Sequence, residues 1–168
     1  HCAVIHPWKL VQGLARVLEA RGIAIYEQSR VVSVKQHSVH TTRARVNARW
    51  VVHAVESFAS QQRRTKRRIV PLYSLMVATE PISPHIWNEI GWSGRETFAD
   101  GRNMVTYAQR TADGRIAFGG RGAPYHFGSS ISDSYDRNTT IHGRLEQTVQ
   151  EIFPQVADAR FTHHWGGP

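Results

Sequence analysis

Apolar positions near the start of the chain recur at the spacing of an α-helix. They lie three or four residues apart and would share one face of that helix. These positions are Leu10, Val11, Leu14, Val17 and Leu18. Pro7 suits a first helical turn, and Gly22 is a typical residue just beyond a last turn. The pattern predicts an amphipathic helix over residues 8–21.

After this helix the pattern changes to short runs rich in β-branched residues. The runs are residues 23–26, 31–34, 38–42 and 46–54. No helical pattern separates them, so we expect these strands to pair as an antiparallel meander. A longer apolar segment, residues 69–79, is broken only by Pro71 and predicts a strand that enters a second sheet.

Two Asp-Gly pairs, at residues 100–101 and 113–114, are typical of hairpin turns. They predict antiparallel strands near residues 95–99, 103–109 and 115–119. Thr139 or Thr140 would cap a last helix that ends before Pro154, and a last strand would cover residues 156–165. The predicted fold class is α+β: a helix with a small sheet, then a larger and mostly antiparallel sheet that carries another helix.

Length and composition narrow the class of protein. The chain has 168 residues, of which 40% are apolar, and this suits one domain or a domain and a fraction. No apolar stretch approaches the roughly 18 residues of a membrane span, so we expect no membrane insertion. The single cysteine, Cys2, excludes an internal disulfide framework and fits the reducing cytoplasm.

Positive charge is concentrated in the first part of the chain. Residues 1–68 contain 13 Lys and Arg against 3 acidic residues, whereas residues 69–168 contain 8 against 10. Five of these cations lie within residues 63–68. One interpretation is a solvated basic linker over residues 59–68. The alternative is a basic module that binds nucleic acid or an acidic protein, although residues 59–68 contain no aromatic side chain on which bases could stack.

Metal ligands and nucleophiles are not clearly indicated. The chain has ten histidines, but His37 and His40 would point to opposite faces of one strand, and His163 and His164 would diverge for the same reason. We therefore predict no metal site. No cysteine or serine stands in a recognisable nucleophile motif, so the catalytic residue stays unknown.

Tyr107 and Arg110 are the strongest candidates for substrate binding. A guanidinium beside a tyrosine hydroxyl can bind a carboxylate or phosphate through paired hydrogen bonds. The alternative interpretation is an exposed sheet face on which Arg110 contacts Asp113 within the predicted turn.

Six short motifs follow one another along the chain. They are His6-Pro7-x-x-Leu10-x-x-Gly13, Gly22-x-x-Ile25-Tyr26-Glu27, Ala48-x-x-Val51-Val52-x-Ala54, Pro71-Leu72-Tyr73-Ser74, Arg110-Thr111-x-Asp113-Gly114-Arg115 and Trp165-Gly166-Gly167-Pro168. In this order they resemble the FAD-dependent amine and amino-acid oxidoreductases of the D-amino-acid-oxidase (DAO) type. The later motifs are most similar to those of γ-glutamylputrescine-oxidase-like members.

The resemblance implies FAD as cofactor, a small amine or amino acid as substrate, and oxidation of its C–N bond. It also implies a domain organisation. Residues 1–58 would be part of an FAD-binding domain, residues 59–68 a basic linker, and residues 69–168 a substrate-binding domain. Such enzymes begin with a GxGxxG segment and end with a second flavin-contacting segment, and this sequence has neither. The chain would then be a central portion, inactive alone.

The resemblance also implies roles for particular residues. Tyr107 and Arg110 would face the substrate. The residues implied in FAD binding are Val31, Ala54, Val55, Trp165 and Gly166. Glu56 departs from the family pattern, which has Gly or a small polar residue there, and its carboxylate would repel the FAD phosphates. A further alternative is an interaction domain that self-associates through the face on which the FAD-binding domain would pack.

Overall fold

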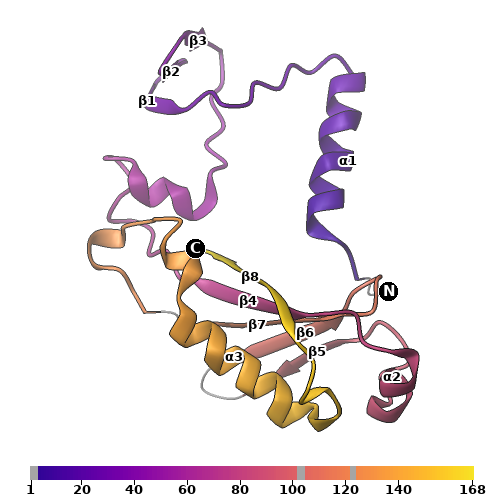
Figure 1. The fold of residues 1–168 in the computed structure, drawn as a ribbon. Coiled ribbons are helices and arrows are strands. Elements are labelled where there is room, and N and C mark those ends of the chain that lie inside the picture. Colours follow the sequence, from indigo (N-terminus) through magenta and orange to yellow (C-terminus); the bar gives the residue numbers. More distant parts are fainter. Residues whose placement is uncertain (1–3, 102–104, 122–123) are drawn as a thin grey trace. The chain divides into compact units, whose positions relative to one another are not determined.

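The computed structural model describes residues 4–101, 105–121 and 124–168, and the chain divides into two compact units (Figure 1). Unit 1 covers residues 1–55 and unit 2 covers residues 56–168. The boundary falls close to the end of the first predicted domain. Antiparallel sheets combined with helices confirm the predicted α+β class.

Unit 1 begins with the predicted amphipathic helix, α1 (Pro7–Ala20). Pro7 occupies the first turn, and the chain leaves the helix through Gly22, whose φ of 78° favours glycine. None of the α1 residues is buried, so the apolar stripe predicted from the sequence lies exposed. Helical periodicity therefore identified the element, although burial of its apolar face does not stabilise it here.

The meander of unit 1 is also confirmed. Strands β1 (Val31–Lys35), β2 (Ser38–Thr41) and β3 (Arg45–Asn47) form an antiparallel sheet in sequence order. The strand predicted at residues 23–26 is wrong, because this segment is irregular and pairs with none of the described strands. The fourth predicted strand is also shorter than expected: only its first residues pair with β2.

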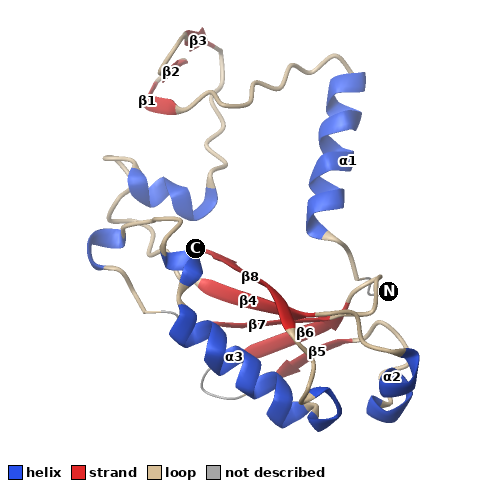
Figure 2. Cartoon of the chain, viewed as in Figure 1, coloured by secondary structure: helices blue, strands red, loops and turns tan. Residues whose placement is uncertain are grey.

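Unit 2 is built on a five-stranded antiparallel sheet in the order β5-β6-β7-β4-β8 (Figure 2). Its strands are β4 (Ser74–Thr79), β5 (Thr97–Asp100), β6 (Thr106–Arg110), β7 (Ile116–Arg121) and β8 (Phe161–Gly167). The β6–β7 hairpin turns at Asp113-Gly114 as predicted, and Gly114 adopts a φ of 78°. The turn predicted at residues 100–101 borders residues 102–104, which lie outside the described residues, so this prediction stays untested.

Helix α3 (Thr139–Ile152) packs against one face of this sheet (Figure 1). Its side chain contacts form the main core with β4 and β7. The most deeply buried apolar residues of this core are Leu75, Val77, Ile116, Phe118, Leu145 and Val149. The predicted cap at Thr139 or Thr140 is wrong by one or two residues: Asn138 is the N-cap, and its side chain accepts a hydrogen bond from the Ile141 amide at 3.1 Å.

A short helix, α2 (Pro84–Ile90), was not predicted. Its sequence signals are present: the Ser83 side chain accepts from the Ile86 amide, Pro84 occupies the first turn, and Gly91 ends the helix at a φ of 74°. Trp87 on this helix is 3% exposed and packs edge-on against Trp92. Burial of these two indoles attaches α2 to the core.

Residues 59–68 belong to unit 2 and are not a free linker. They continue the 3₁₀ helix Glu56–Gln61 through a series of turns. Gln61 Nε2 donates to the Ser129 carbonyl at 2.7 Å, which joins this segment to the loop before α3. None of the helices formed by the described residues is long and apolar enough to cross a bilayer.

Candidate functional site

The sheet of unit 2 has one face covered by α3 and an opposite face, here called the open face. The strand registers place five residues in one row across the open face. In order they are Ala99, Tyr107, Gly119, Met76 and Trp165. Residues directly opposite one another on antiparallel strands share a face, so this row is contiguous. Trp165 remains 41% exposed at its end.

Gly119 is required at the centre of this row. A Cβ at this position would lie 2.1 Å from Met76 Sδ and 2.6 Å from Tyr107 Cε2. Only a residue without a side chain therefore lets the Tyr107 ring lie across β7. The sequence analysis placed Gly119 at the end of the strand predicted over residues 115–119, whereas the structure shows it beneath the Tyr107 ring.

The Tyr107 hydroxyl is held across the sheet by Ser74. The two hydroxyls hydrogen-bond to each other, and Ser74 Oγ also lies 3.4 Å from the Gly120 carbonyl, to which it can donate. Ser74 is directly opposite Arg121, so both side chains are on the open face. The described residues contain no ion pair of the Arg121 guanidinium, which is exposed.

These groups line a pocket of about 430 Å³, here called the Tyr107 pocket. Its other walls are the 3₁₀ helix at Glu56, the apolar side chains of Val70 and Leu72, and the end of β8. Glu56 adopts a φ of 48°, and its carboxylate accepts a hydrogen bond from the Ser57 amide. Hydrogen bonding to Ser57 lowers the pKa of Glu56, so this wall carries a negative charge at neutral pH.

The structure does not bring Tyr107 and Arg110 together. They are three residues apart within β6, so their side chains are on opposite faces of the sheet. The Arg110 guanidinium carbon lies 4.3 Å from the Trp87 ring centroid, and Nη1 donates to the Trp92 carbonyl at 2.9 Å. The cation next to Tyr107 is Arg121 instead.

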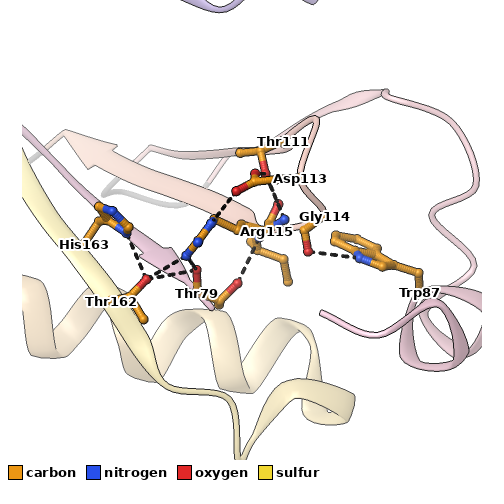
Figure 3. Close-up of polar contacts among 9 residues, drawn as sticks. Thr79, Trp87, Thr111, Asp113, Gly114, Arg115, Thr162 and His163 are labelled. Atoms are coloured by element: carbon orange, nitrogen blue, oxygen red, sulfur yellow. Dashed lines mark hydrogen bonds and ion pairs between the residues drawn. The ribbon is translucent and has the colours of Figure 1, made fainter. Parts of the chain in front are cut away.

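The alternative contact between Arg110 and Asp113 is not formed either. Asp113 pairs with Arg115, at 2.7 Å between Oδ2 and Nε (Figure 3). Arg115 Nη1 also donates to the Thr79 carbonyl and to Thr162 Oγ1, at 3.0 and 2.9 Å. Arg115 therefore ties the start of β7 to β4 and β8. Hydrogen bonds from Thr111 and then Arg115 lower the pKa of Asp113.

The five residues implied in FAD binding are divided between the units. Val31 lies in β1 of unit 1, and Ala54 and Val55 lie in an irregular segment at its end, all three exposed or half-buried. In unit 2, Trp165 is on the open face. A Cβ on Gly166 would lie 2.1 Å from Leu75 Cδ2, so Gly166 faces the α3 side. Their role in cofactor binding stays a prediction.

The central row of the open face is mainly apolar. The Tyr107 ring and Met76 cover the buried Gly119, and Trp165 lies beside Met76 with its side chain partly exposed. The described residues contain no group of three or more His, Cys, Asp or Glu side chains placed to hold a metal ion. The groups that a ligand could contact here are therefore apolar side chains, the hydroxyls of Tyr107 and Ser74, the Arg121 guanidinium and the Glu56 carboxylate.

Sequence reasoning identified Tyr107 but missed Ser74, Arg121 and Glu56. Ser74 and Arg121 stand at the start of β4 and the end of β7, and only the register places them opposite each other. The period-2 pattern of β7 could have put Arg121 on the face of Gly119. No local signal links either residue to Glu56.

Over residues 1–168 the chain matches the family described as FAD dependent oxidoreductase (DAO). The chain belongs to this family, as the resemblance of its motifs implied.

Two curated relatives carry the name "Probable oxidoreductase OrdL". That of Rhizobium meliloti (strain 1021) is 30% identical over 168 residues, covering 97% of this chain and 36% of the relative. That of Haemophilus influenzae is 25% identical over 173 residues, covering 98% of this chain and 37% of the relative. The chain therefore spans about a third of the length of the curated relatives it matches.

Solved structures share the fold. L-proline dehydrogenase from P. horikoshii matches with a TM-score of 0.65 and 18% identity, over 96% of this chain and 42% of that one. Glycine oxidase from Geobacillus kaustophilus matches with a TM-score of 0.65 and 19% identity, over 94% and 40%. At these identities the likeness concerns the fold alone.

Proposed function

We propose that this chain is the substrate-facing portion of an FAD-dependent oxidoreductase that oxidises the C–N bond of a small amine or amino acid. The observation that carries the proposal is the Tyr107 pocket, in which opposite charges lie beside a fixed phenol on the open face. Family membership supports the cofactor, and the names of the two solved neighbours support an amino-acid substrate.

Each polar group of the pocket has a distinct role in this proposal. Arg121 binds a substrate carboxylate through its guanidinium. Glu56, ionised at neutral pH, attracts the substrate ammonium. The Tyr107 hydroxyl, held by Ser74, orients the substrate between them. Val70 and Leu72 present apolar side chains to the same pocket and reduce the access of water.

FAD, when bound, would supply the oxidation by accepting a hydride equivalent from the C–H bond beside the amine; the nitrogen loses a proton, and the C–N bond of the substrate becomes a C=N bond. Trp165 on the open face would contact its ring, and Gly166 would fix the backbone of β8 there. Val31, Ala54 and Val55 would contact the remainder of the cofactor from unit 1. The glycine-rich phosphate-binding motif is absent from these 168 residues, so we expect the chain alone to bind FAD weakly and to be inactive.

The test of FAD binding is a visible absorption spectrum. The chain is mixed with FAD, desalted and measured, and we expect no retained flavin band. With free FAD left in excess and oxygen removed, a small amino acid is then added and bleaching of the flavin band is followed. We expect no bleaching from the chain alone. A retained band would contradict the expected weak binding, and an amino-acid-dependent bleaching would contradict the expected inactivity while supporting the oxidation chemistry.

The substrate site is tested separately by NMR of the side chains. Adding a small amino acid should shift the signals of Tyr107 and Arg121. Arg121→Gln should weaken this binding about tenfold or more, because a charged hydrogen bond is lost. Arg160→Gln, which removes an exposed arginine outside the pocket, is the matched control and should leave binding unchanged. Equal loss in both variants would contradict the assignment.

A second candidate function is binding of a nucleic acid or another polyanion by residues 63–68. The described residues contain no ion pair of these five cations. The neighbouring loop adds an aromatic side chain that the basic run itself lacks, because Phe127 is 97% exposed. Neutralising Arg63, Arg64, Arg67 and Arg68 should abolish steeply salt-dependent binding of an oligonucleotide. Unchanged binding would reject this candidate.

A cytoplasmic location and self-association also belong to the proposal. The single cysteine supports a reducing compartment. The exposed apolar stripe of α1 supports association with another surface. Cell fractionation tests the first, and the light-scattering mass tests the second.

A further inference from the structure

A second polar pocket lies at the β6–β7 turn, on the side of the sheet away from Tyr107. It has a volume of about 470 Å³ and is here called the Arg110 pocket. The residues that matter for its chemistry are Trp87, Ser93, Arg95, Arg110, Thr111 and Asp113. It shares no lining residue with the Tyr107 pocket.

The Arg110 guanidinium is held in place before any ligand binds. It lies over the Trp87 ring at 4.3 Å, and one nitrogen donates to the Trp92 carbonyl at 2.9 Å. Trp87 is itself fixed, because it is buried and its Nε1 donates to the Gly114 carbonyl at 3.2 Å (Figure 3). A planar guanidinium fixed in this way loses little side-chain entropy when it binds an anion.

The charge of Arg110 is not balanced by the protein. Asp113 is the carboxylate at this pocket, and it is already bound by Arg115 at 2.7 Å and by Thr111 Oγ1 at 2.6 Å. Within the described ranges, Arg110 forms no ion pair. A half-buried cation without a counterion is unfavourable, and contact with an indole compensates for only part of that cost.

The remaining polar groups of the pocket also favour an anion. Arg95 adds a second, exposed guanidinium, and Ser93 adds a hydroxyl that can donate a hydrogen bond. Ile82 and Pro84 provide the apolar part of the lining. The pocket therefore combines two cations with a carboxylate that Arg115 already neutralises.

We propose that the Arg110 pocket binds a small oxyanion, that is, a carboxylate or phosphate-type group. Arg110 donates two hydrogen bonds to the anion from above the Trp87 ring, and Arg95 and Ser93 complete its ligands. This site is independent of the proposed substrate site and lies on the other side of the sheet.

The probes are inorganic phosphate and acetate, added separately, with sodium chloride at the same ionic strength as reference. The Nε–Hε NMR signal of Arg110 and the fluorescence of Trp87 report on the site. We expect saturable changes with at least one of the two probes and none with chloride. The probe that binds more tightly identifies which oxyanion class the pocket prefers.

Three variants localise the binding. Arg110→Gln should weaken affinity about ten- to a hundredfold, because a charged hydrogen-bonding group is lost. Arg95→Gln changes an exposed residue that is not needed for folding, and it should weaken affinity several-fold. Arg144→Gln removes an exposed cation of α3 that lines neither pocket, and it is the control that should leave affinity unchanged.

The proposal is overturned if neither phosphate nor acetate gives a saturable change, or if chloride gives the same change. It is also overturned if Arg144→Gln weakens binding as much as Arg95→Gln, since the effect would then reflect overall charge. Loss of folding in Arg110→Gln would not affect these conclusions, because Arg95→Gln provides the same test in a folded protein.

Discussion

Replacing Gly119 with alanine tests the central feature of the open face. The added methyl group would lie 2.1 Å from Met76 Sδ and 2.6 Å from Tyr107 Cε2, so both of these side chains must move. Met76 is flexible and can turn away, but the Tyr107 ring is rigid and can yield only by tilting off β7. Tilting would separate its hydroxyl from Ser74.

The size of the effect follows from these two changes. Overpacking of this kind costs about 1–3 kcal/mol, and loss of a hydrogen bond adds about 1 kcal/mol. The free energy of unfolding of unit 2 should therefore fall by about 2–4 kcal/mol. With an m-value of about 2 kcal/mol per molar urea, the unfolding midpoint should fall by about 1–2 M.

Urea unfolding monitored by circular dichroism measures this change. Gly143→Ala is the control, because a Cβ at this α3 position has no atom within 4 Å, and alanine should stabilise the helix by about 0.5–1 kcal/mol. The double variant Met76→Ala/Gly119→Ala should recover part of the loss, because one of the two close contacts is removed. An unchanged midpoint for Gly119→Ala would refute the reasoning.

Three other changes have defined outcomes. Asn138→Ala removes the N-cap of α3 and should lower the free energy of unfolding by about 1 kcal/mol, measured in urea, whereas Asn138→Ser should retain most of it. Hydrogen bonds from the Arg160 side chain and then from the Arg160 amide lower the pKa of Glu80 in the folded protein. The ionised Glu80 carboxylate therefore stabilises the fold above its unfolded pKa of 4.5. This stabilisation is lost as the pH falls through the lower pKa of the folded state. Arg160→Gln should therefore reduce the acid dependence of the urea midpoint below about pH 5, and an unaltered pH profile would contradict this. Finally, Leu14→Ser on the exposed stripe of α1 should lower any light-scattering mass above that of the monomer, and a mass unaffected by it would exclude this face from association.

Local patterns predicted the elements whose signals are contained in a few residues. The stripe at Leu10 and Leu14 predicted α1, and the Asp113-Gly114 pair predicted the β6–β7 hairpin. The strand predicted over residues 23–26 did not form, because β-branched residues make a strand only when another strand pairs with them. Helix α2 was overlooked although Ser83 and Gly91 marked its ends, since seven residues are too few to show a helical period.

The sequence predicted less of the site than of the fold. The sequence identified Tyr107 as a candidate because it is an aromatic residue on a predicted strand. The prediction that Arg110 lies beside it rested only on their closeness in the sequence. Residues an odd number of positions apart on one strand point to opposite faces of the sheet. The rule applies to Tyr107 and Arg110 only because β6 extends to Arg110, whereas the predicted strand ended at residue 109. Arg121 became the partner because the register places it opposite Ser74.

The sequence by itself determined the order of the elements, the hairpin at Asp113-Gly114 and membership of the FAD-dependent oxidoreductases, because these depend on residue types at short spacings. Only the tertiary structure decided which side chains meet. Strand register joins Ser74, Tyr107 and Arg121 on one face, and packing of α2 places Arg110 over Trp87 on the other side of the sheet. Register and packing are set by contacts between segments far apart in the chain, and no local pattern contains them.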